Sequence, residues 1–577
     1  MEGVVALDGP VDRKVRGAFF TPPAIAKFLA RWAIAGRHDA RVLDPTCGEG
    51  IFLLAAAQQL RGLGASGGGL DGQVYGVDVH EPFLRGTMQL LEAEGLDARL
   101  VEGDFFELPA PGNLFATFPA FDAVVGNPPF VRYQRHTGAA RRRSAGAALR
   151  EGVRLSGLAS SWAALLVHAG AFLEPDGRLA MVVPAELLTV GYAEPVRQWL
   201  RRRFAGVKLV LFERLQFADV LEDVLLVLAH GTGGCDAFSV YHVEDAEDLY
   251  RIQPFDEFAM TLAEEGKWTD LLLSIQQRQT FKRVVSDHFV GLGSYGPPEL
   301  GTVTGANAFF TLTEEVRRAF GLVEGRHVSR VSPPGTRHLR GLTFTASDWE
   351  SLRSAGEAVW ILHPDGSKHT PGLARYLARG EGAGVPEAYK CRIRTPWWRP
   401  PVVSPPDLFF TYMSHRHPRL LTNSAGVTFV NSMHGVRLRR DAAPIAKNAL
   451  PLVALNSVTM LGAEVHGRSY GGGILKMEPR EAAVLPVPAP AVLEQAWQVL
   501  QPERPGLDQQ LRGGRWNDVV ARVDDVLLRD TLGLDAAQIR LLADAARTLR
   551  SRRLARSGSA GSADSAAFPP VSSRREE

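Results

Sequence analysis

The chain has 577 residues, of which 45% are hydrophobic and 22% charged, a balance typical of globular proteins with more than one domain. Its 65 basic and 63 acidic residues leave a net charge of +2, which excludes a strong overall field toward nucleic acid or membranes. Three distant cysteines, Cys47, Cys235 and Cys391, exclude a disulfide framework and a Cys-x-x-Cys metal site. No signal peptide or membrane-length apolar run is apparent, so we expect a cytoplasmic protein without membrane contact or bound metal.

From about Arg41 to Ala229, apolar runs rich in β-branched residues alternate with helical patterns, which predicts an α/β fold with a mostly parallel sheet. A helix over residues 21–33 is expected before the first strand, with Thr21 as N-cap and Pro22 in the first helical position. The segments VKLVLFE and DVLLVLAH lack a crossover helix between them, so we expect an antiparallel hairpin at one end of the sheet.

The composition changes after about residue 235, where strands become short and Gly, Pro, Trp and Arg recur. The expected organisation is a first domain over 1–235, a connecting region over 236–289, a loop-rich α+β domain over 290–490, a C-terminal helical segment over 500–555 and a disordered tail over 556–577.

The segment RVLDPTCGEGIFLLAA predicts a ligand site. A strand ends at Asp44, a tight turn follows at Gly48 and Gly50, and a helix begins near Ile51. Glycines let the backbone approach a ligand, and the helix N-terminus presents free N–H groups. The spacing fits neither a dinucleotide nor a triphosphate motif, and an acidic strand end favours a cationic, nucleotide-like cofactor.

Two further acids follow strands of the same sheet. Asp78 closes the second strand, where a carboxylate can accept hydrogen bonds from ribose hydroxyls. Asp104 closes the third strand and can accept a hydrogen bond from an adenine amine, while Phe105 offers an apolar face. Either acid alone is more often a solvated turn residue, but three at successive strand ends indicate a site.

The fourth strand leads into the tetrapeptide Asn127-Pro128-Pro129-Phe130. The amine of a heterocycle is a poor nucleophile because its lone pair is delocalised into the ring. If the Asn127 side-chain oxygen and the Pro128 carbonyl each accept one N–H, the nitrogen can become tetrahedral and attack. Pro129 keeps that carbonyl rigid, and Phe130 can stack on the base.

These motifs resemble the S-adenosylmethionine (SAM)-dependent DNA adenine-N6 methyltransferases of the TaqI-like group, the gamma order with an N-terminal motif X, and the Eco57I-type methylase domains. The resemblance rests on GAFFTPP (17–23), DPTCGEG (44–50), VDV (77–79), GDFF (103–106) and NPPF, and covers about residues 13–235 at motif level. It implies that the cofactor is held by Phe20, Thr21, Asp44, Pro45, Cys47, Gly48, Gly50, Asp78, Asp104 and Phe105.

The resemblance also implies a Rossmann-like methyltransferase sheet followed by a target recognition domain, and a flipped adenine as the substrate. Phe130 stands where Tyr is common, which keeps the stacking surface but removes a hydroxyl. A second aromatic residue holds the flipped base in the family, and Phe217 occupies the expected segment. The partner is therefore duplex DNA, modified as part of a restriction system.

Basic residues supply the expected DNA-binding surface. The loop after the catalytic motif contains Arg132, Arg135, Arg141, Arg142 and Arg143, and the second domain contains Lys390, Arg392 and Arg394 next to Trp397 and Trp398. A solvated charged face is as good an interpretation of the arginine-rich loop, and core packing is as good an interpretation of the two tryptophans.

Other functions remain open. The same chemistry serves guanine N2 in RNA or a glutamine in a protein, and a catalytically silent DNA-specificity module could keep the fold. The pattern Pro254–Asp256 with Glu265–Lys267 only loosely imitates a metal nuclease, and the methylase motifs begin at residue 17, so we expect no fused nuclease. A cognate restriction endonuclease would be a separate polypeptide, and we expect a monomer.

Overall fold

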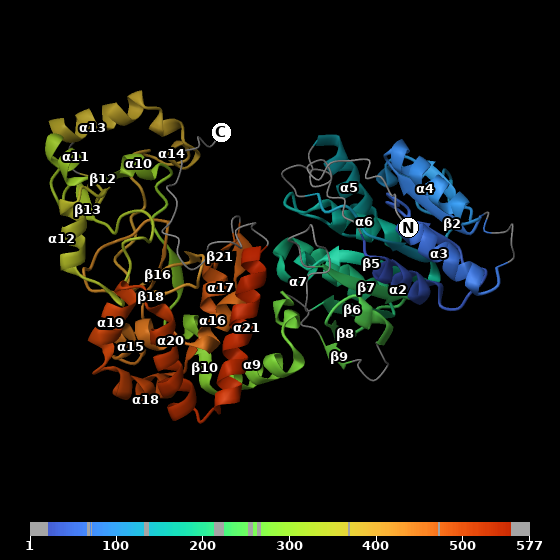
Figure 1. Ribbon diagram of the computed structural model, residues 1–577. Coiled ribbons are helices and arrows are strands. Elements are labelled where there is room, and N and C mark those ends of the chain that lie inside the picture. Colours follow the sequence, from blue (N-terminus) through green and yellow to red (C-terminus); the bar gives the residue numbers. More distant parts are fainter. Residues whose placement is uncertain are drawn as a thin grey trace. The chain divides into compact units, whose positions relative to one another are not determined.

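The computed structural model describes residues 21–65, 70, 72–131, 138–212, 224–251, 258–261, 267–366, 370–470 and 473–555. The chain forms two compact units, residues 1–272 (unit 1) and 273–577 (unit 2) (Figure 1).

Unit 1 is built on one sheet, which has nine strands among the described residues. The strands are β1 (Val42–Asp44), β2 (Val74–Asp78), β3 (Arg99–Glu102), β4 (Phe121–Gly126), β5 (Leu173–Pro184), β6 (Gly206–Phe212), β7 (Val224–His230), β8 (Ala237–Val243) and β9 (Phe258–Thr261). The helices are α2 (Pro23–Ile34), α3 (Ile51–Gly62), α4 (Glu81–Ala93), α5 (Gly138–Arg150), α6 (Ser161–Gly170), α7 (Glu186–Thr189) and α8 (Glu194–Arg203), with 3-10 turns at Phe105–Glu107, Gly191–Ala193, Glu247–Arg251 and Thr269–Leu272.

The sheet order is β3-β2-β1-β4-β5-β7-β6-β8-β9. The strands from β3 to β5 pair in parallel, so the carboxyl ends of β1, β2 and β4 meet at one edge. β7 pairs antiparallel with both β5 and β6, which confirms the predicted antiparallel hairpin. The predicted α/β class with a mostly parallel sheet is confirmed.

The hairpin does not end the sheet, because β8 joins β6 in parallel and β9 joins β8. The predicted domain limit at residue 235 and the connecting region over 236–289 therefore differ from the structure, in which residues as far as Leu272 belong to unit 1. Hydrogen bonding explains the difference: β8 satisfies the backbone groups along the edge of β6, which would otherwise be an exposed edge strand.

Helix α2 begins one residue later than predicted. Its N-cap is Pro22, which makes no side-chain cap, and its first residue is Pro23. Thr21 is not the N-cap because its hydroxyl accepts a hydrogen bond from the Asn127 amide instead. Helix α2 packs on α3 and on strands β4 and β5 (Figure 1), and the chain continues from it into β1.

Unit 2 contains several small sheets. Its strands are β10 (Phe289–Gly291), β11 (Pro298–Leu300), β12 (Thr311–Leu312), β13 (Val328–Arg330), β14 (Thr343–Phe344), β15 (Trp360–Leu362), β16 (Leu408–Phe410), β17 (Met413–Ser414), β18 (Leu420–Asn423), β19 (His434–Val436), β20 (Arg468–Tyr470), β21 (Ile474–Lys476) and β22 (Pro486–Pro488). Among the residues given above, the sheets are β10-β22, β11-β19-β16-β18-β14, β12-β15-β13 and β17-β21-β20. These short strands agree with the loop-rich α+β prediction.

Helices surround these sheets. They are α9 (Ile275–His288), α10 (Asn307–Phe310), α11 (Glu314–Ala319), α12 (Ala346–Ser354), α13 (Pro371–Gly382), α14 (Tyr389–Arg392), α15 (Ala446–Val453), α16 (Ser457–His466), α17 (Pro479–Ala483), α18 (Pro490–Leu500), α19 (Arg504–Arg512), α20 (Trp516–Asp524) and α21 (Ala536–Ala555), with a π-helical turn at Asp525–Thr531 and 3-10 turns at Leu292–Ser294 and Val385–Glu387. The C-terminal region is helical, as predicted. The predicted disordered tail lies outside the described residues.

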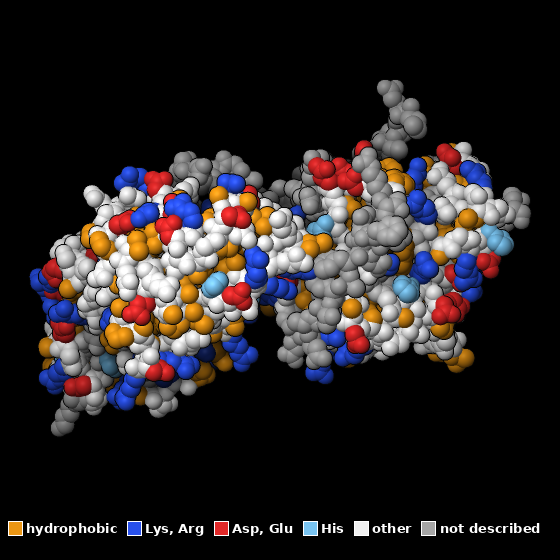
Figure 2. Space-filling model, turned by 90° about the horizontal axis from the view of Figure 1, so that it is seen from below, with side chains coloured by type: hydrophobic (Ala, Val, Ile, Leu, Met, Phe, Trp, Pro, Cys, Tyr) orange, Lys and Arg blue, Asp and Glu red, His pale blue; other side chains and the backbone are white. Residues whose placement is uncertain are grey.

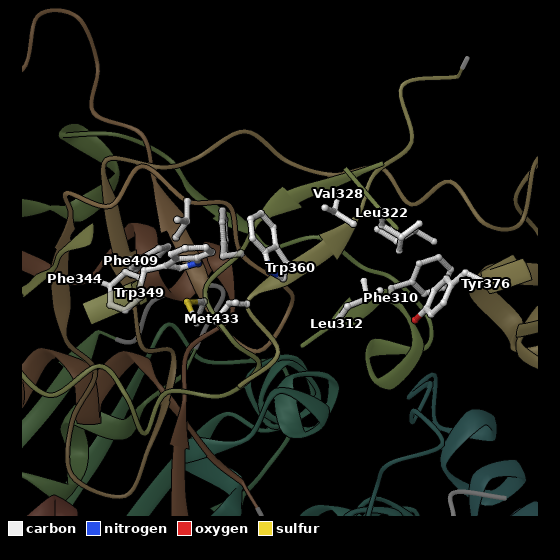
Figure 3. Close-up of a cluster of buried hydrophobic side chains, with 14 of the residues drawn as sticks. Phe310, Leu312, Leu322, Val328, Phe344, Trp349, Trp360, Tyr376, Phe409 and Met433 are labelled. Atoms are coloured by element: carbon white, nitrogen blue, oxygen red, sulfur yellow. The ribbon is translucent and has the colours of Figure 1, made fainter. Parts of the chain in front are cut away.

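An aromatic core stabilises unit 2 (Figure 3). The rings of Trp349 and Trp360 meet edge to face at 5.2 Å, and Phe309 stacks on Tyr376 at 4.8 Å. Trp397 packs against the same cluster at 5.6 Å from Phe309, so the packing interpretation of this tryptophan is the one that the structure favours. On the face in Figure 2, basic and acidic side chains are interspersed, in line with the net charge of +2.

Candidate active site

The glycine turn after β1 is shaped by backbone that most residues avoid. Gly48 and Gly50 adopt left-handed φ angles of +49° and +80°. A Cβ atom on Gly50 would lie 2.5 Å from Cγ2 of Thr87, whereas no described atom lies within 4 Å of the same position on Gly48. The Thr87 hydroxyl donates to the Gly48 carbonyl at 2.8 Å. The turn is therefore packed against α4 at Gly50 and accessible to a ligand at Gly48.

Asp44 ends β1, as predicted, and its side chain is completely buried. One carboxyl oxygen, Oδ1, accepts the Thr46 N–H at 3.0 Å. The other, Oδ2, is buried and has no hydrogen-bond partner in the described part of the chain. Burial raises the pKa of Asp44 to about 8, with a further contribution from Asp78 and an opposing one from the Thr46 N–H. Such a carboxyl group suits a cationic ligand, whose charge would compensate for the lost solvation.

Asp78 ends β2, as predicted, and its carboxylate is fixed by two backbone amides. Gly48 donates to Oδ2 at 3.0 Å and His80 donates to Oδ1 at 2.9 Å. Each carboxylate oxygen keeps further acceptor capacity, which two neighbouring hydroxyl groups can use. The turn that contains Gly48 and the acid that follows β2 are thus one hydrogen-bonded unit.

Asp104 lies two residues beyond the end of β3, where it caps a 3-10 turn by accepting the Phe106 N–H at 3.0 Å. Its second oxygen accepts from Arg143 Nε at 2.9 Å, and the same Nε lies 3.2 Å from Glu107. Arg143 was predicted to bind DNA, but its guanidinium is engaged by these two carboxylates. Arg143 thus forms an ion pair with Asp104, and its predicted contact with DNA stays a prediction.

Phe105 is only 3% exposed, because its ring packs against His168 at 4.9 Å and Phe172 at 4.8 Å. The predicted adenine platform needs a free ring face, which this packing does not leave. Phe106 is half-buried and stacks on His168 at 6.0 Å. Burial lowers the pKa of His168 to about 4, so this imidazole is neutral at physiological pH.

Asn127 follows β4 directly, so the catalytic motif lies at the edge where β1 and β2 also end. Its Nδ2 donates to the Thr21 hydroxyl at 3.1 Å. Its Oδ1 is buried and has no hydrogen-bond partner among the described residues. Thr21 therefore fixes the amide so that the oxygen is the atom available to a substrate donor.

Gly126 lies between the two residues that carry an unpaired oxygen, Asp44 and Asn127. A Cβ atom at this position would lie 2.8 Å from Oδ1 of Asp44, so a larger residue would displace the buried Asp44 carboxyl group. Asn127, predicted to be catalytic, is the next residue. The acid of the glycine motif and the amide of the catalytic motif are consequently neighbours.

The second half of the catalytic motif is attached to the start of α6. Ser161 donates its hydroxyl hydrogen to the Pro129 carbonyl and accepts the Val131 N–H at 2.9 Å. The Ser161 N–H also donates to the Val131 carbonyl at 3.0 Å. Phe130 lies between these anchored residues and is 6% exposed. Sequence reasoning missed Ser161, since nothing in SWAALLVHAG marks a contact with residues 30 positions earlier.

The predicted arginine-rich loop is helical from Gly138 to Arg150 (α5), because alanine and arginine favour helix. Arg141 and Arg142 line a cavity of about 220 Å³ with Ser156 and Ser160, next to the start of α6. Arg132 and Arg135 lie outside the described residues, as do Phe20 and Phe217. The segment Pro254–Asp256 and Glu265 of the rejected nuclease pattern also lie outside them.

In unit 2, Lys390 and Arg392 are exposed on α14. Arg394 differs, because its guanidinium donates to the carbonyls of Val303 at 3.1 Å, Thr304 at 2.9 Å and Trp397 at 3.3 Å. A guanidinium engaged by three carbonyls connects loops of the domain. These contacts give Arg394 a structural role, and its predicted contact with DNA stays a prediction.

All three cysteines are free. Within the described ranges, no group of three or more His, Cys, Asp or Glu side chains is placed to hold a metal ion. The same residues include no helix with the length and apolar character needed to cross a bilayer.

Comparison with known proteins identifies two matched regions. Residues 6–209 match the N-6 DNA Methylase family, and residues 265–528 match the C-terminal domain of type II methyltransferase M.Eco57I. The type II methyltransferase M.AccI of Acinetobacter calcoaceticus is 20% identical over 478 residues, covering 81% of this chain and 84% of that protein. M.XamI of Xanthomonas campestris pv. amaranthicola is 24% identical over 490 residues, covering 82% and 85%. The solved structure of the type IIL restriction-modification enzyme MmeI in complex with DNA has a TM-score of 0.47 at 13% identity, covering 95% of this chain and 80% of that one.

A parallel sheet whose strand ends combine a glycine turn, an unpaired acid and an amide acceptor belongs to the class of SAM-dependent methyltransferases. The two matched regions indicate the kind of methyltransferase. Residues 6–209 are similar to N-6 DNA methylases, and residues 265–528 are similar to the C-terminal domain of M.Eco57I. The chain is a SAM-dependent DNA methyltransferase directed at adenine N6, which confirms the predicted family, enzyme class and cofactor.

Proposed function

We propose that this chain is the modification methyltransferase of a restriction-modification system and methylates adenine N6 within one specific duplex sequence. The alignments with M.AccI and M.XamI support this assignment, because they extend over most of both chains, including the C-terminal domain. The cognate restriction endonuclease is a separate polypeptide, and the methyltransferase works as a monomer in the cytoplasm.

The observation that carries the proposal is the buried Oδ1 of Asn127. A buried acceptor without a donor costs free energy on the order of 1–3 kcal/mol, and a substrate N–H removes that cost. In the proposed mechanism Oδ1 accepts one N–H of the adenine amine and the Pro128 carbonyl accepts the other. The nitrogen then becomes tetrahedral and its lone pair is freed from the ring. As the new N–C bond forms, the bond from the methyl carbon to the sulfonium sulfur would break to leave a neutral thioether, and the proton displaced from nitrogen would pass to water.

The cofactor pocket is assigned to the strand ends on the same edge. The completely buried Asp44 would hold the cationic part of SAM, Asp78 would accept from the ribose hydroxyls, and Asp104 would accept from the adenine amine. Pro45 and Cys47 belong to the turn that contains Gly48. When bound there, SAM would supply the electrophilic methyl group.

The target adenine has to leave the duplex to reach Asn127, and unstacking costs on the order of a few kcal/mol. Phe130 stacks on the extruded base, and Phe217 remains a prediction for the opposite side. Arg141 and Arg142 bind phosphates beside the flipped nucleotide, since their helix α5 packs against α6, which carries the anchor of the catalytic motif. Lys390 and Arg392 contribute exposed positive charge from unit 2.

The test measures methyl transfer from labelled SAM to duplex DNA, followed by mass spectrometry of the nucleosides. We expect N6-methyladenine from the wild type. Asn127→Ala should reduce transfer by at least about 100-fold and keep SAM binding, because one of two acceptors for the reacting amine is removed. Asn113→Ala is the matched control, since Asn113 is exposed and its oxygen only accepts the Phe115 N–H.

RNA and protein substrates are assayed in parallel. Transfer to a guanine amine of RNA or to a glutamine, with none to DNA, would replace adenine as the substrate. Undiminished transfer by Asn127→Ala, or a methyl group found on carbon, would refute the mechanism. DNA binding without transfer to any substrate would support a silent specificity module.

A further inference from the structure

We propose that Ser161 is a positioning residue for methyl transfer, because its hydroxyl and backbone hold the catalytic tetrapeptide in its working geometry. The inference rests on the roles assigned above to the Pro128 carbonyl and Phe130. It adds a residue that lies outside every methylase motif of the sequence, 34 positions after Asn127.

Three hydrogen bonds connect Ser161 to the motif. Its Oγ donates to the Pro129 carbonyl, its Oγ accepts the Val131 N–H at 2.9 Å, and its own N–H donates to the Val131 carbonyl at 3.0 Å. The bonded groups flank Phe130 on both sides. Ser161 thereby fixes the backbone that carries the proposed stacking ring.

The same bonds determine the direction of the Pro128 carbonyl. The ring of Pro129 fixes its own φ angle near −65°, so the peptide plane that carries the Pro128 oxygen cannot rotate about that bond. The remaining freedom at Pro129 is the ψ angle, and the hydrogen bond from Ser161 to the Pro129 carbonyl restrains it. A single side chain therefore restrains both the acceptor carbonyl and the stacking ring.

The anchor itself is rigid. Ser161 is the first residue of α6 and is 5% exposed, and every residue of this helix is buried. Helix α6 packs on β5, which pairs directly with β4, the strand that ends before Asn127. Thr21 holds Asn127 at the other end of the motif. The motif is thus held at both ends by hydroxyl groups, each from a different element.

The chain offers a matched control at the adjacent position. Ser160 is 6% exposed, and its hydroxyl accepts from Tyr192 at 3.1 Å instead of contacting the motif. Removing either hydroxyl deletes the same atom from the same buried region. Only Ser161→Ala removes contacts to Pro129 and Val131.

The experiment compares Ser161→Ala, Ser161→Thr and Ser160→Ala in the full chain. In single-turnover methyl transfer to duplex DNA, we expect Ser161→Ala to lower the rate of the chemical step about 100-fold, the effect of a small misplacement of reacting groups. The affinities for SAM and DNA should stay within about threefold, so kcat falls while KM does not rise. Ser160→Ala should remain within about threefold of the wild type, and Ser161→Thr should recover most of the rate because it keeps a hydroxyl.

Hydrogen exchange provides a readout independent of activity. Pro128 and Pro129 have no N–H, so exchange in a peptide spanning 127–131 reports on Phe130 and Val131. Ser161→Ala should increase exchange there, and Ser160→Ala should not. If Ser161→Ala is too unstable for the rate assay, hydrogen exchange is measured instead in Ser161→Thr and in Ser161→Cys, whose thiol is a weak hydrogen-bonding substitute for the hydroxyl. We expect the amides in 127–131 to stay protected in Ser161→Thr and to lose protection in Ser161→Cys.

The outcomes separate the two proposals. Unchanged kcat in Ser161→Ala, equal losses in Ser160→Ala, or unchanged exchange at 127–131 would overturn the positioning role while Asn127 chemistry stands. A wild type that transfers no methyl group to adenine, with exchange at 127–131 still governed by Ser161, would overturn the proposed function and with it the catalytic meaning of the anchor.

Discussion

Binding of SAM should release a proton from Asp44. Burial raises the pKa of this carboxyl group to about 8, so at pH 7 roughly nine tenths of the free protein carries the proton. A cationic ligand beside the group favours the ionised form and lowers the pKa again. We therefore expect about 0.9 proton to be released per SAM bound at pH 7, whereas an ordinary aspartate would release almost none.

The same linkage sets the pH dependence of affinity. If SAM binds the ionised carboxylate, the association constant follows its population, which increases about eightfold between pH 6.5 and 7.5. In this range the amino group of the ligand stays mostly protonated, so the change belongs to the protein. Isothermal titration calorimetry in two buffers of different ionisation enthalpy counts the released protons directly. Methylthioadenosine, which lacks the charged amino-acid part, is the ligand control and should release few.

Asp44→Asn extends the test, because the amide keeps an acceptor for the Thr46 N–H but cannot ionise. It should lose SAM binding. Since the native carboxyl keeps a proton that the unfolded chain gives up, wild-type stability falls as pH rises from about 4 to about 8, by about 4 kcal/mol at pH 7. The ligand-free variant should therefore be less pH-sensitive in denaturant unfolding. Proton release below about 0.3 together with a flat affinity profile would refute the assignment of Asp44.

Two pairs of substitutions test the rest of the site and unit 2. Arg394→Ala should lower the free energy of unfolding by about 2 kcal/mol, because the carbonyls that Arg394 contacts lose a charged donor. Arg392→Ala should leave the free energy of unfolding unchanged and reduce the salt dependence of DNA binding by about one ion. If both substitutions weakened DNA binding equally and neither changed stability, Arg394 would belong to the DNA-binding surface. Gly50→Ala should destabilise unit 1 by more than about 1 kcal/mol, since the φ angle of Gly50 is +80° and the new Cβ would lie 2.5 Å from Thr87. The control Gly86→Ala lies in open space on α4 and should be neutral or stabilising in thermal unfolding. A Gly50→Ala protein as stable as the wild type would contradict the packing described for the turn.

Sequence patterns located the strand-end residues because each lies in a local signal. Asp44, Asp78 and Asn127 directly follow apolar runs, and parallel strands bring their carboxyl ends to one edge. The tight turn at Gly48 and Gly50 was likewise expected from the two glycines, and both adopt left-handed φ angles. These predictions needed no knowledge of which strands are neighbours, only that the sheet is parallel.

The partners of those residues could not be predicted, because they come from distant positions. Thr21 contacts Asn127 across 106 positions, and its hydroxyl cannot cap α2 at the same time. Arg143 belongs to a basic cluster, and charge alone does not distinguish a phosphate contact from an ion pair with Asp104. The same holds for Arg394, because its charge alone does not reveal that the guanidinium donates to backbone carbonyls.

Two buried oxygens without a hydrogen-bond partner define the proposed site. In the part of the chain that the structure describes, Oδ2 of Asp44 and Oδ1 of Asn127 are buried without a donor. Asp44 is the last residue of β1 and Asn127 is the residue after β4, and these two strands are adjacent. Most buried polar atoms in folded proteins have a hydrogen-bond partner, so two buried oxygens without one lower the stability of the ligand-free fold. Each accepts a different kind of donor: the acid suits a cation, and the amide oxygen suits a neutral N–H. Gly126 lies against the Asp44 side chain and directly precedes Asn127, so the proposed cofactor and amine sites would adjoin each other, as direct methyl transfer requires.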